Sequence, residues 1–260
     1  MVAPKALRRL APDRLRDDPR VRAIALAVGL IPPRTMHSQA ESAALTSLAA
    51  RARRVVELGV YEGSSAVVLC RALGPEAELH LVDPFIDASG WALRPGASAS
   101  ATATRLAVRR AAAGGGPSLR WYLERSQDVG RRWSAGPVDL VFIDGDHSPE
   151  GCREDWDVWH HHVSPGGAVA FHDARAGRPG GAGSPGPTSV VDDLFRTAAP
   201  AAALAGADPA PTAAADPAAA PAGAAPATAP DPDPDPAPTW SITDEIDSLV
   251  VVRRAPPAKT

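Results

Sequence analysis

Acidic and histidine residues follow two apolar runs of this sequence. Asp144 and His147 come directly after the first run, and His172 and Asp173 come directly after the second. If both runs are parallel strands, their carboxyl ends meet at one edge of a sheet, where small ligands bind. We therefore expect the four side chains to converge, and a neutral imidazole there can accept a proton near neutral pH. The alternatives are that the acids cap the following loops and that His147 caps the next helix.

A glycine-bracketed turn follows an earlier apolar run. Glu57 stands at the end of this predicted strand, and Gly59 and Gly63 bracket the loop that leads into an apolar helix. The spacing lacks one glycine of the dinucleotide fingerprint G-x-G-x-x-G, which weakens a pyrophosphate-binding interpretation. An acid with this looser loop suits a cationic, amino-acid-like ligand that carries an adenosine. Asp83, at the end of the next strand, is placed to accept hydrogen bonds from two ribose hydroxyls. Without a ligand, the glycines would only shape a strand-to-helix turn.

The elements that must position these residues alternate between strands and helices. Ser38, with Glu41 three residues later, predicts the start of the first helix of the domain. Apolar runs predict parallel strands, at 54–57, 78–83, 119–123, 138–143 and 166–171. Two further strands, at 239–243 and 248–253, predict an antiparallel hairpin at the sheet edge. The fold class is therefore α/β, with a Rossmann-like doubly wound sheet that is mostly parallel and carries an antiparallel C-terminal hairpin.

Composition divides the chain into three parts. Residues 1–35 predict an N-terminal helical extension, and residues 36–197 together with 239–255 predict a single domain. Residues 198–238 consist almost entirely of Ala, Pro, Asp and Thr. Such a segment cannot bury enough apolar surface to offset the entropy of ordering, so we expect a disordered insertion.

Charge and cysteine content limit the partners and the location. The formal net charge of −3 provides no general attraction to nucleic acid or to an anionic membrane. No signal peptide or membrane span is visible, and the two cysteines form neither a disulfide framework nor a zinc site, so the expected location is the reducing cytoplasm. The run His160–His162 lies at a predicted helix end and is expected on the surface. The loop at 87–104 is expected to cover the site, with Trp91 as a substrate wall.

Taken together, these motifs resemble the class I S-adenosylmethionine-dependent methyltransferases, and more closely the small-molecule O-methyltransferases of the catechol and macrocin type, including methyltransferase family 24. The turn after Glu57 resembles their first motif, Ser126-Gln-Asp128 their adenine-side motif, and Asp144-Gly-Asp-His147 the end of their fourth strand. The resemblance spans roughly residues 36–174 and the final hairpin. It implies a small-molecule substrate, and dimers are common among similar enzymes. It also implies S-adenosylmethionine as cofactor, held by Glu57, Gly59, Gly63, Asp83, Ser126 and Gln127.

The same resemblance implies a divalent metal, usually Mg²⁺, held by Asp144 and by a pair of residues after the fifth strand. The pair in this sequence is His172 and Asp173. Imidazole suits manganese, iron or zinc better than magnesium, so the site is either adapted to another metal or metal-free with His172 orienting the substrate. The resemblance places the catalytic base at His147, three residues after Asp144. Asp146 is either the second candidate for the base or the residue that orients His147.

The expected function is transfer of a methyl group from S-adenosylmethionine to a hydroxyl of a small molecule. Three other functions remain open at this point. The first is a metal-independent methyltransferase of the same fold that acts on nitrogen or on a carboxylate. The second is a non-catalytic S-adenosylmethionine-binding protein or scaffold that recruits partners through residues 198–238. The third, a nicotinamide oxidoreductase, is disfavoured by the glycine spacing.

Overall fold

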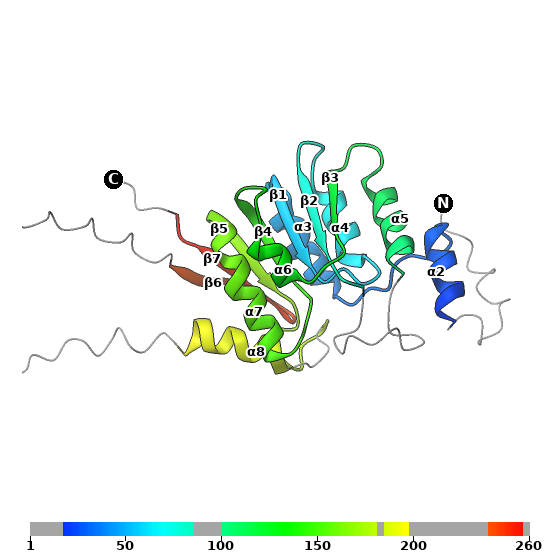
Figure 1. Cartoon of the computed structure of the whole chain (residues 1–260). Helices are drawn as coiled ribbons and strands as arrows, with labels where there is room; N and C mark the ends of the chain where they lie inside the picture. Colours follow the sequence, from blue (N-terminus) through cyan, green and yellow to red (C-terminus); the bar gives the residue numbers. More distant parts are fainter. Residues whose placement is uncertain (1–17, 86–99, 181–184, 198–238, 257–260) are drawn as a thin grey trace, which may run out of the picture.

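The computed structural model describes residues 18–85, 100–180, 185–197 and 239–256. They contain a seven-stranded sheet in the order β3-β2-β1-β4-β5-β7-β6 (Figure 1). The strands are β1 (Arg54–Leu58), β2 (Glu78–Val82), β3 (Ser118–Tyr122), β4 (Val138–Ile143), β5 (Val163–Phe171), β6 (Trp240–Ile246) and β7 (Leu249–Arg254). Strands β1 to β5 pair in parallel, whereas β7 is antiparallel to both β5 and β6. The predicted sheet and its C-terminal hairpin are confirmed.

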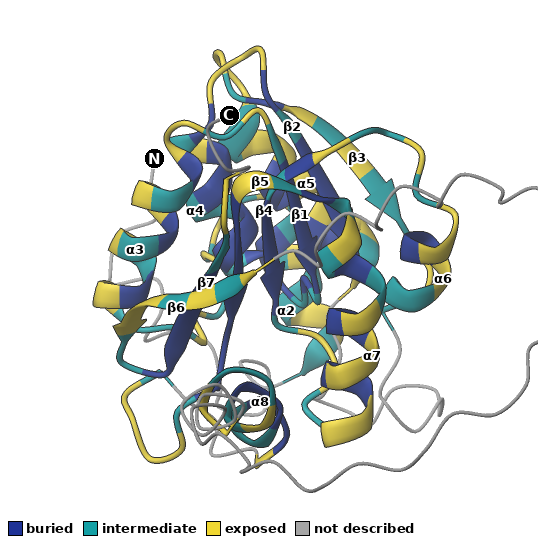
Figure 2. Cartoon of the chain, turned by 90° about the vertical axis from the view of Figure 1, so that its left-hand side faces the viewer, coloured by how far each residue is buried: buried dark blue, intermediate teal, exposed yellow. Residues whose placement is uncertain are grey.

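Helices cover both faces of the sheet. They are α2 (Pro19–Ala27), α3 (Gln39–Ala49), α4 (Ser64–Ala72), α5 (Ala101–Ala112), α6 (Ser126–Arg131), α7 (Pro149–Trp159) and α8 (Pro185–Val191), with a 3₁₀ turn η2 (His160–His162) and a π-helical segment η3 (Asp192–Arg196). Side chains of α3, α4 and α5 form one apolar core with one face of the sheet. Side chains of α6, α7 and α8 form a second core on the other face. Figure 2 shows the buried residues concentrated on the central strands between these two layers.

The strand order brings the predicted functional residues to one edge. Leu58 of β1 pairs with Val82 of β2 on one side and with Ile143 of β4 on the other, and Ile143 pairs in turn with Phe171 of β5. The four strands therefore end in register. The order of connection reverses between β1 and β4, which is where open α/β sheets bind ligands.

Strand β5 is longer than predicted. It begins at Val163 instead of Gly166, and its pairing with β4 shifts between Val138 and Leu140. Gly166 has a φ of 80°, a conformation that glycine adopts without a steric penalty, so the chain bulges there and then continues as a strand.

The histidine run lies at the end of α7, as predicted, but two of its three side chains are half-buried instead of exposed. Trp156 and Trp159 are buried in the core. His160 and His162 are half-buried and His161 is exposed. The rings of His160 and His162 contact the carbonyl oxygens of Trp156 and Gly130, at 2.7 and 2.9 Å. They make local contacts at a helix end and lie outside the site described below.

Three sequence predictions lie outside the described residues. These are the disordered insertion at 198–238, the position of Trp91, and most of the covering loop that contains it. The N-terminal extension is described from residue 18, where α2 packs through Leu26 against Ala103 and Ala107 of α5. The proposed domain boundaries remain predictions. Across the described segments, no helix combines the length and apolar character that crossing a membrane requires.

Candidate active site

The turn between β1 and α4 lies directly against the end of β4. Gly59 and Gly63 both have a φ of 84°, in the left-handed region that favours glycine. A Cβ atom at Gly59 would lie 2.6 Å from the carbonyl carbon of Asp144 and 2.7 Å from Cα of Gly145. The turn therefore needs glycine at position 59 for two reasons, its backbone conformation and the closeness of a second backbone.

Glu57 supplies a buried carboxyl group beneath this turn. It is inaccessible to solvent, and its Oε1 accepts a hydrogen bond from Ser65 Oγ. Its Oε2 atom is buried without a hydrogen-bond partner. Burial raises the pKa of Glu57 well above its usual value, and the Ser65 hydrogen bond opposes that shift only in part. An unpaired buried oxygen at this place fits a ligand that brings a donor group of its own.

Asp83 secures the same turn from the end of β2. Its Oδ2 atom accepts hydrogen bonds from the backbone amides of Val60 and Tyr61, both at 2.8 Å, and its Oδ1 atom accepts one from Phe85 at 2.6 Å. The sequence predicted a ribose-binding acid here, and the structure shows an acid that holds the glycine turn. Each carboxylate oxygen can accept more than one hydrogen bond, so the two roles are compatible.

The side chains of Ser126 and Gln127 both contact Asp155, a residue that the sequence did not single out. Gln127 Nε2 donates to Asp155 Oδ1 at 2.9 Å, and Ser126 Oγ donates to the same oxygen. Asp155 is almost fully buried, its Oδ2 has no hydrogen-bond partner, and burial raises its pKa to about 7. The sequence contained a signal, because Asp155 is spaced from Cys152 and Trp159 as the buried face of a helix requires.

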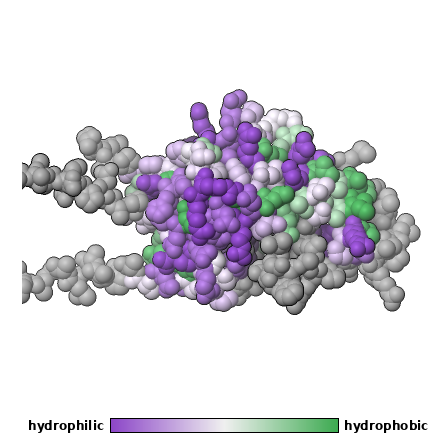
Figure 3. Space-filling model, viewed as in Figure 1, coloured by the Kyte–Doolittle hydropathy of each residue, from purple (hydrophilic) through white to green (hydrophobic). Residues whose placement is uncertain are grey.

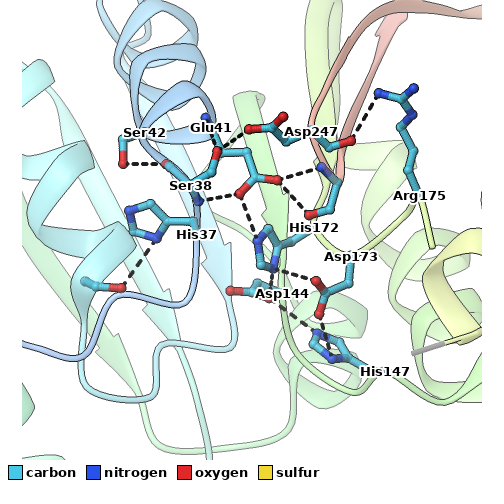
Figure 4. A network of polar contacts seen from close by, with 12 residues as sticks. His37, Ser38, Glu41, Ser42, Asp144, His147, His172, Asp173, Arg175 and Asp247 are labelled. Carbon is cyan, nitrogen blue, oxygen red and sulfur yellow. Dashed lines mark hydrogen bonds and ion pairs between the residues drawn. The ribbon is translucent and has the colours of Figure 1, made fainter. Parts of the chain in front are cut away.

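The two acids and two histidines predicted at the sheet edge converge into one cluster (Figure 4). His172 Nδ1 lies 2.8 Å from Asp144 Oδ1 and 3.6 Å from Asp173 Oδ1. His147 lies between the same two acids, with Nε2 3.3 Å from Asp144 Oδ1 and Nδ1 3.3 Å from Asp173 Oδ2. His172 and Asp173 are buried, whereas Asp144 and His147 remain partly open to solvent. The partly open pair is the accessible side of the cluster.

The carboxylates strongly affect the charge of both histidines. Burial alone would lower the pKa of His172, but the neighbouring carboxylates of Asp144 and Glu41 raise it to about 10. The hydrogen bond to Asp144 raises the pKa of His147 above its usual value, against a smaller opposing effect of burial. Burial would raise the pKa of Asp144, yet the two histidines hold it below its usual value. Opposite charges therefore stabilise each other across the cluster.

Asp146 does not have the orienting role that the sequence suggested as one option. Its carboxylate accepts a hydrogen bond from the amide of Ser148 at 2.9 Å, and the side chain packs against Gly151 at the start of α7. It therefore forms a local turn at the beginning of a helix, as aspartate often does. Asp144 and Asp173 are the acids that contact His147.

Glu41 is the second residue that the sequence reasoning missed as part of the site. The predicted capping box at the start of α3 is present, with Ser38 and Glu41 bonded to each other's backbone amides. Glu41 is also completely buried, and its Oε2 atom lies 3.5 Å from His172 Nε2. Nothing in the local sequence distinguishes this glutamate from an ordinary capping residue.

The cluster offers a donor set for a divalent transition metal. One ligand atom from each of the four residues, two imidazole nitrogens and two carboxylate oxygens, can be chosen so that all lie within 4.8 Å of one another. Mixed nitrogen and oxygen donors suit manganese, iron or zinc, whereas magnesium prefers oxygen donors. The residues therefore fit a metal ion, but one other than Mg²⁺.

The chain is similar to known proteins in both sequence and fold. The family model of methyltransferase family 24, described as a methyltransferase domain, matches residues 56–174. The cofactor-bound protein Rv0187 from MTB superposes with a TM-score of 0.51 at 17% identity, over 95% of this chain and 92% of that one. A protein from Corynebacterium glutamicum superposes with a TM-score of 0.50 at 17% sequence identity, over 96% of this chain and 94% of that one. A third structure is the O-methyltransferase TomG from Streptomyces achromogenes, which is involved in tomaymycin synthesis and was solved in complex with SAM. It superposes with a TM-score of 0.48 at 20% sequence identity, over 94% of this chain and 91% of that one.

Proposed function

Residues 56–174 form a methyltransferase domain of family 24, and we propose that the chain transfers the methyl group of S-adenosylmethionine to a hydroxyl oxygen of a small molecule. One observation carries the proposal. The backbone of Gly59, in the turn that would hold the methyl donor, lies against Asp144 and Gly145, at the edge of the acid–histidine cluster. The proposed donor and acceptor sites would therefore be neighbours, as a direct transfer between two bound molecules requires.

The proposed cofactor site runs along the ends of β1, β2 and β3. S-adenosylmethionine supplies a methyl group on a positively charged sulfur. The unpaired oxygen of Glu57 would accept a hydrogen bond from the amino-acid end, and the turn from Gly59 to Gly63 would lie against the ligand. Asp83 would accept the ribose hydroxyls while it holds the turn. Ser126 and Gln127 would lie beside the adenine, with Asp155 orienting both side chains.

His147 is the proposed base. The acceptor hydroxyl loses its proton to the imidazole as the oxygen forms its bond to the methyl carbon and the carbon–sulfur bond breaks. The products are the methyl ether and S-adenosylhomocysteine. Asp144 and Asp173 contact the two ring nitrogens and stabilise the imidazolium that forms.

Calorimetry and product analysis test the function. We expect S-adenosylhomocysteine to bind and NAD not to bind, and S-adenosylmethionine to label hydroxylated small molecules with its methyl group. Binding of S-adenosylhomocysteine without transfer to any hydroxyl, amine or carboxylate in a panel would favour the non-catalytic binding protein. Binding of neither ligand would contradict the proposal and leave the scaffold alternative.

Asp144, His172 and Asp173 would hold a divalent metal, with His147 beside it. A metal ion there would lower the pKa of the acceptor hydroxyl and help to orient it. We expect chelation to reduce turnover, and added Mn²⁺ or Fe²⁺ to restore it better than Mg²⁺ at equal concentration. Restoration by Mg²⁺ alone would contradict the proposed donor set, and turnover unaffected by chelation would assign the cluster to substrate orientation.

A homodimer is the proposed assembly, and the cytoplasm is the proposed location. Large apolar side chains are exposed mainly around α2 and its neighbour α5, and hydrophobic residues gather at that end of the molecule (Figure 3). They are Val21, Ile24, Val28, Leu30, Met36 and Leu106. Such a patch is typical of a contact surface. We expect sedimentation equilibrium to show a dimer that Ile24→Asp converts to a monomer, whereas a wild-type monomer would contradict the proposal.

A further inference from the structure

A buried carboxylate contacts the active-site cluster from behind. We propose that Glu41 is a positioning residue that sets the ring orientation of His172, and that the turn of the C-terminal hairpin holds Glu41 for this purpose. The inference rests on the proposed function of the cluster. It adds helix α3 and the β6–β7 turn to a site otherwise built from the ends of strands.

Glu41 is held at one carboxylate oxygen by its own capping box and at the other by the distant hairpin turn (Figure 4). Its Oε1 atom accepts hydrogen bonds from the amide of Ser248 at 2.8 Å and from Ser248 Oγ at 2.6 Å. Its Oε2 atom accepts one from the amide of Ser38 at 2.7 Å and lies 3.5 Å from Nε2 of His172. Three hydrogen bonds and the neighbouring imidazole therefore surround a carboxylate that is excluded from water.

A capping role alone does not explain this environment. A capping box needs only one hydrogen bond to its glutamate, and that glutamate can remain in water. Glu41 is instead fully buried, and Gly180 covers it so closely that a Cβ atom there would lie 2.8 Å from Glu41 Cδ. Removing a charge from water is costly unless the charge is paired. Among the described residues, the histidine that faces this carboxylate is His172.

The contact assigns different tasks to the two ring nitrogens of His172. Nδ1 faces Asp144 at 2.8 Å, whereas Nε2 is buried without a hydrogen bond to any described residue and lies 3.5 Å from Oε2 of Glu41. A carboxylate behind one ring nitrogen favours a proton on that nitrogen and fixes the plane of the ring. Glu41 therefore directs Nδ1 toward Asp144 and Asp173, whether that side holds a metal ion or the substrate.

The hairpin turn completes the support. Ser248 lies 207 residues after Glu41 in the chain, and its carbonyl oxygen accepts a hydrogen bond from the amide of Ala174 at 2.9 Å. The preceding Asp247 accepts a hydrogen bond from Ser38 Oγ at 2.5 Å, and its carbonyl oxygen accepts one from Arg175 at 3.1 Å. The turn thus connects the start of α3 to the residues directly after His172 and Asp173.

The decisive experiment compares Glu41→Gln with the wild-type protein. Glutamine can accept the same hydrogen bonds through its amide oxygen but removes the charge that faces His172. We expect long-range ¹H–¹⁵N spectra of the His172 ring to change, and affinity for Mn²⁺ or turnover to fall about 10- to 100-fold. Binding of S-adenosylhomocysteine should not change. Glu78→Gln is the matched control, because Glu78 pairs with Arg54 at the opposite end of the sheet.

A second variant covers the case in which Glu41→Gln does not fold. Ser248→Ala removes one hydrogen bond to Glu41 but keeps its charge, so we expect a smaller change of the His172 ring signals in the same direction. Unchanged His172 signals in the folded variants would overturn the inference. The spectra do not depend on turnover. The positioning role of Glu41 can therefore be contradicted while methyl transfer is demonstrated, and it can be supported while no methyl transfer is found.

Discussion

Replacing His147 by alanine is expected to lower kcat by about 10²- to 10⁴-fold, the usual contribution of a positioned general base. His147 is the accessible histidine of the cluster, and both of its ring nitrogens face carboxylates that stabilise the protonated form. The cofactor site lies on the neighbouring strands and should be unaffected. Single-turnover measurements with radiolabelled S-adenosylmethionine would give the rate of the chemical step, and calorimetry with S-adenosylhomocysteine would show that binding is retained.

His161→Ala is the matched control for this variant. His161 is an exposed histidine in η2, outside the cluster, and its loss should leave kcat unchanged. If His147→Ala turned over the true substrate at a near-normal rate, His147 would not be the base.

The pH dependence provides an independent check on the same residue. The base must be unprotonated to accept the proton, and the hydrogen bond to Asp144 raises the pKa of His147 above 6.5. Activity should therefore be low at acidic pH and rise with an inflection above 6.5. His147→Ala should lose this inflection, and an inflection below 6.5 in the wild-type protein would be inconsistent with the environment of His147.

Replacing Gly59 by alanine is expected to destabilise the fold by about 3–5 kcal/mol and to abolish cofactor binding. The residue has a φ of 84°, which costs an alanine about 1–2 kcal/mol. The added Cβ would also collide with the backbone of Asp144 and Gly145, which cannot move aside as a flexible side chain would. Denaturant unfolding would measure the loss of stability, and calorimetry with S-adenosylhomocysteine would measure binding.

Gly166→Ala separates the two contributions. Gly166 has nearly the same backbone angle, a φ of 80°, but no atom lies within 4 Å of a Cβ atom built there. Its replacement should lower the free energy of unfolding only by the conformational contribution of about 1–2 kcal/mol and should leave the proposed cofactor site intact. Equal destabilisation by the two variants would show that the contact between Gly59 and the end of β4 is not tight.

Local patterns in the sequence predicted most of the fold. Apolar runs located the strands because a strand buried on both faces carries few polar residues, as in β4, where the one charged residue, Asp139, is only half-buried. Ser38 and Glu41 located the start of α3 because capping depends on residues only three positions apart. The same local signals predicted that Asp144, His147, His172 and Asp173 would share one edge of the sheet.

Contacts between distant segments could not be predicted in the same way. The hydrogen bonds of Ser126 and Gln127 to Asp155 join α6 to α7, and the orienting acids of His147 turned out to be Asp144 and Asp173 instead of Asp146. Which acid reaches a given ring depends on side-chain direction and on the packing of whole elements. Neither is encoded in the spacing of residues along the chain.

The sequence by itself determined the sheet, the glycine turn and the residue types at the strand ends, because these depend on short-range periodicity and backbone conformation. Only the tertiary structure decided how those residues are paired. Glu41 faces His172 because α3, β5 and the C-terminal hairpin pack together and exclude water from its carboxylate. A buried charge requires partners, and folding brought those partners from segments more than a hundred residues away.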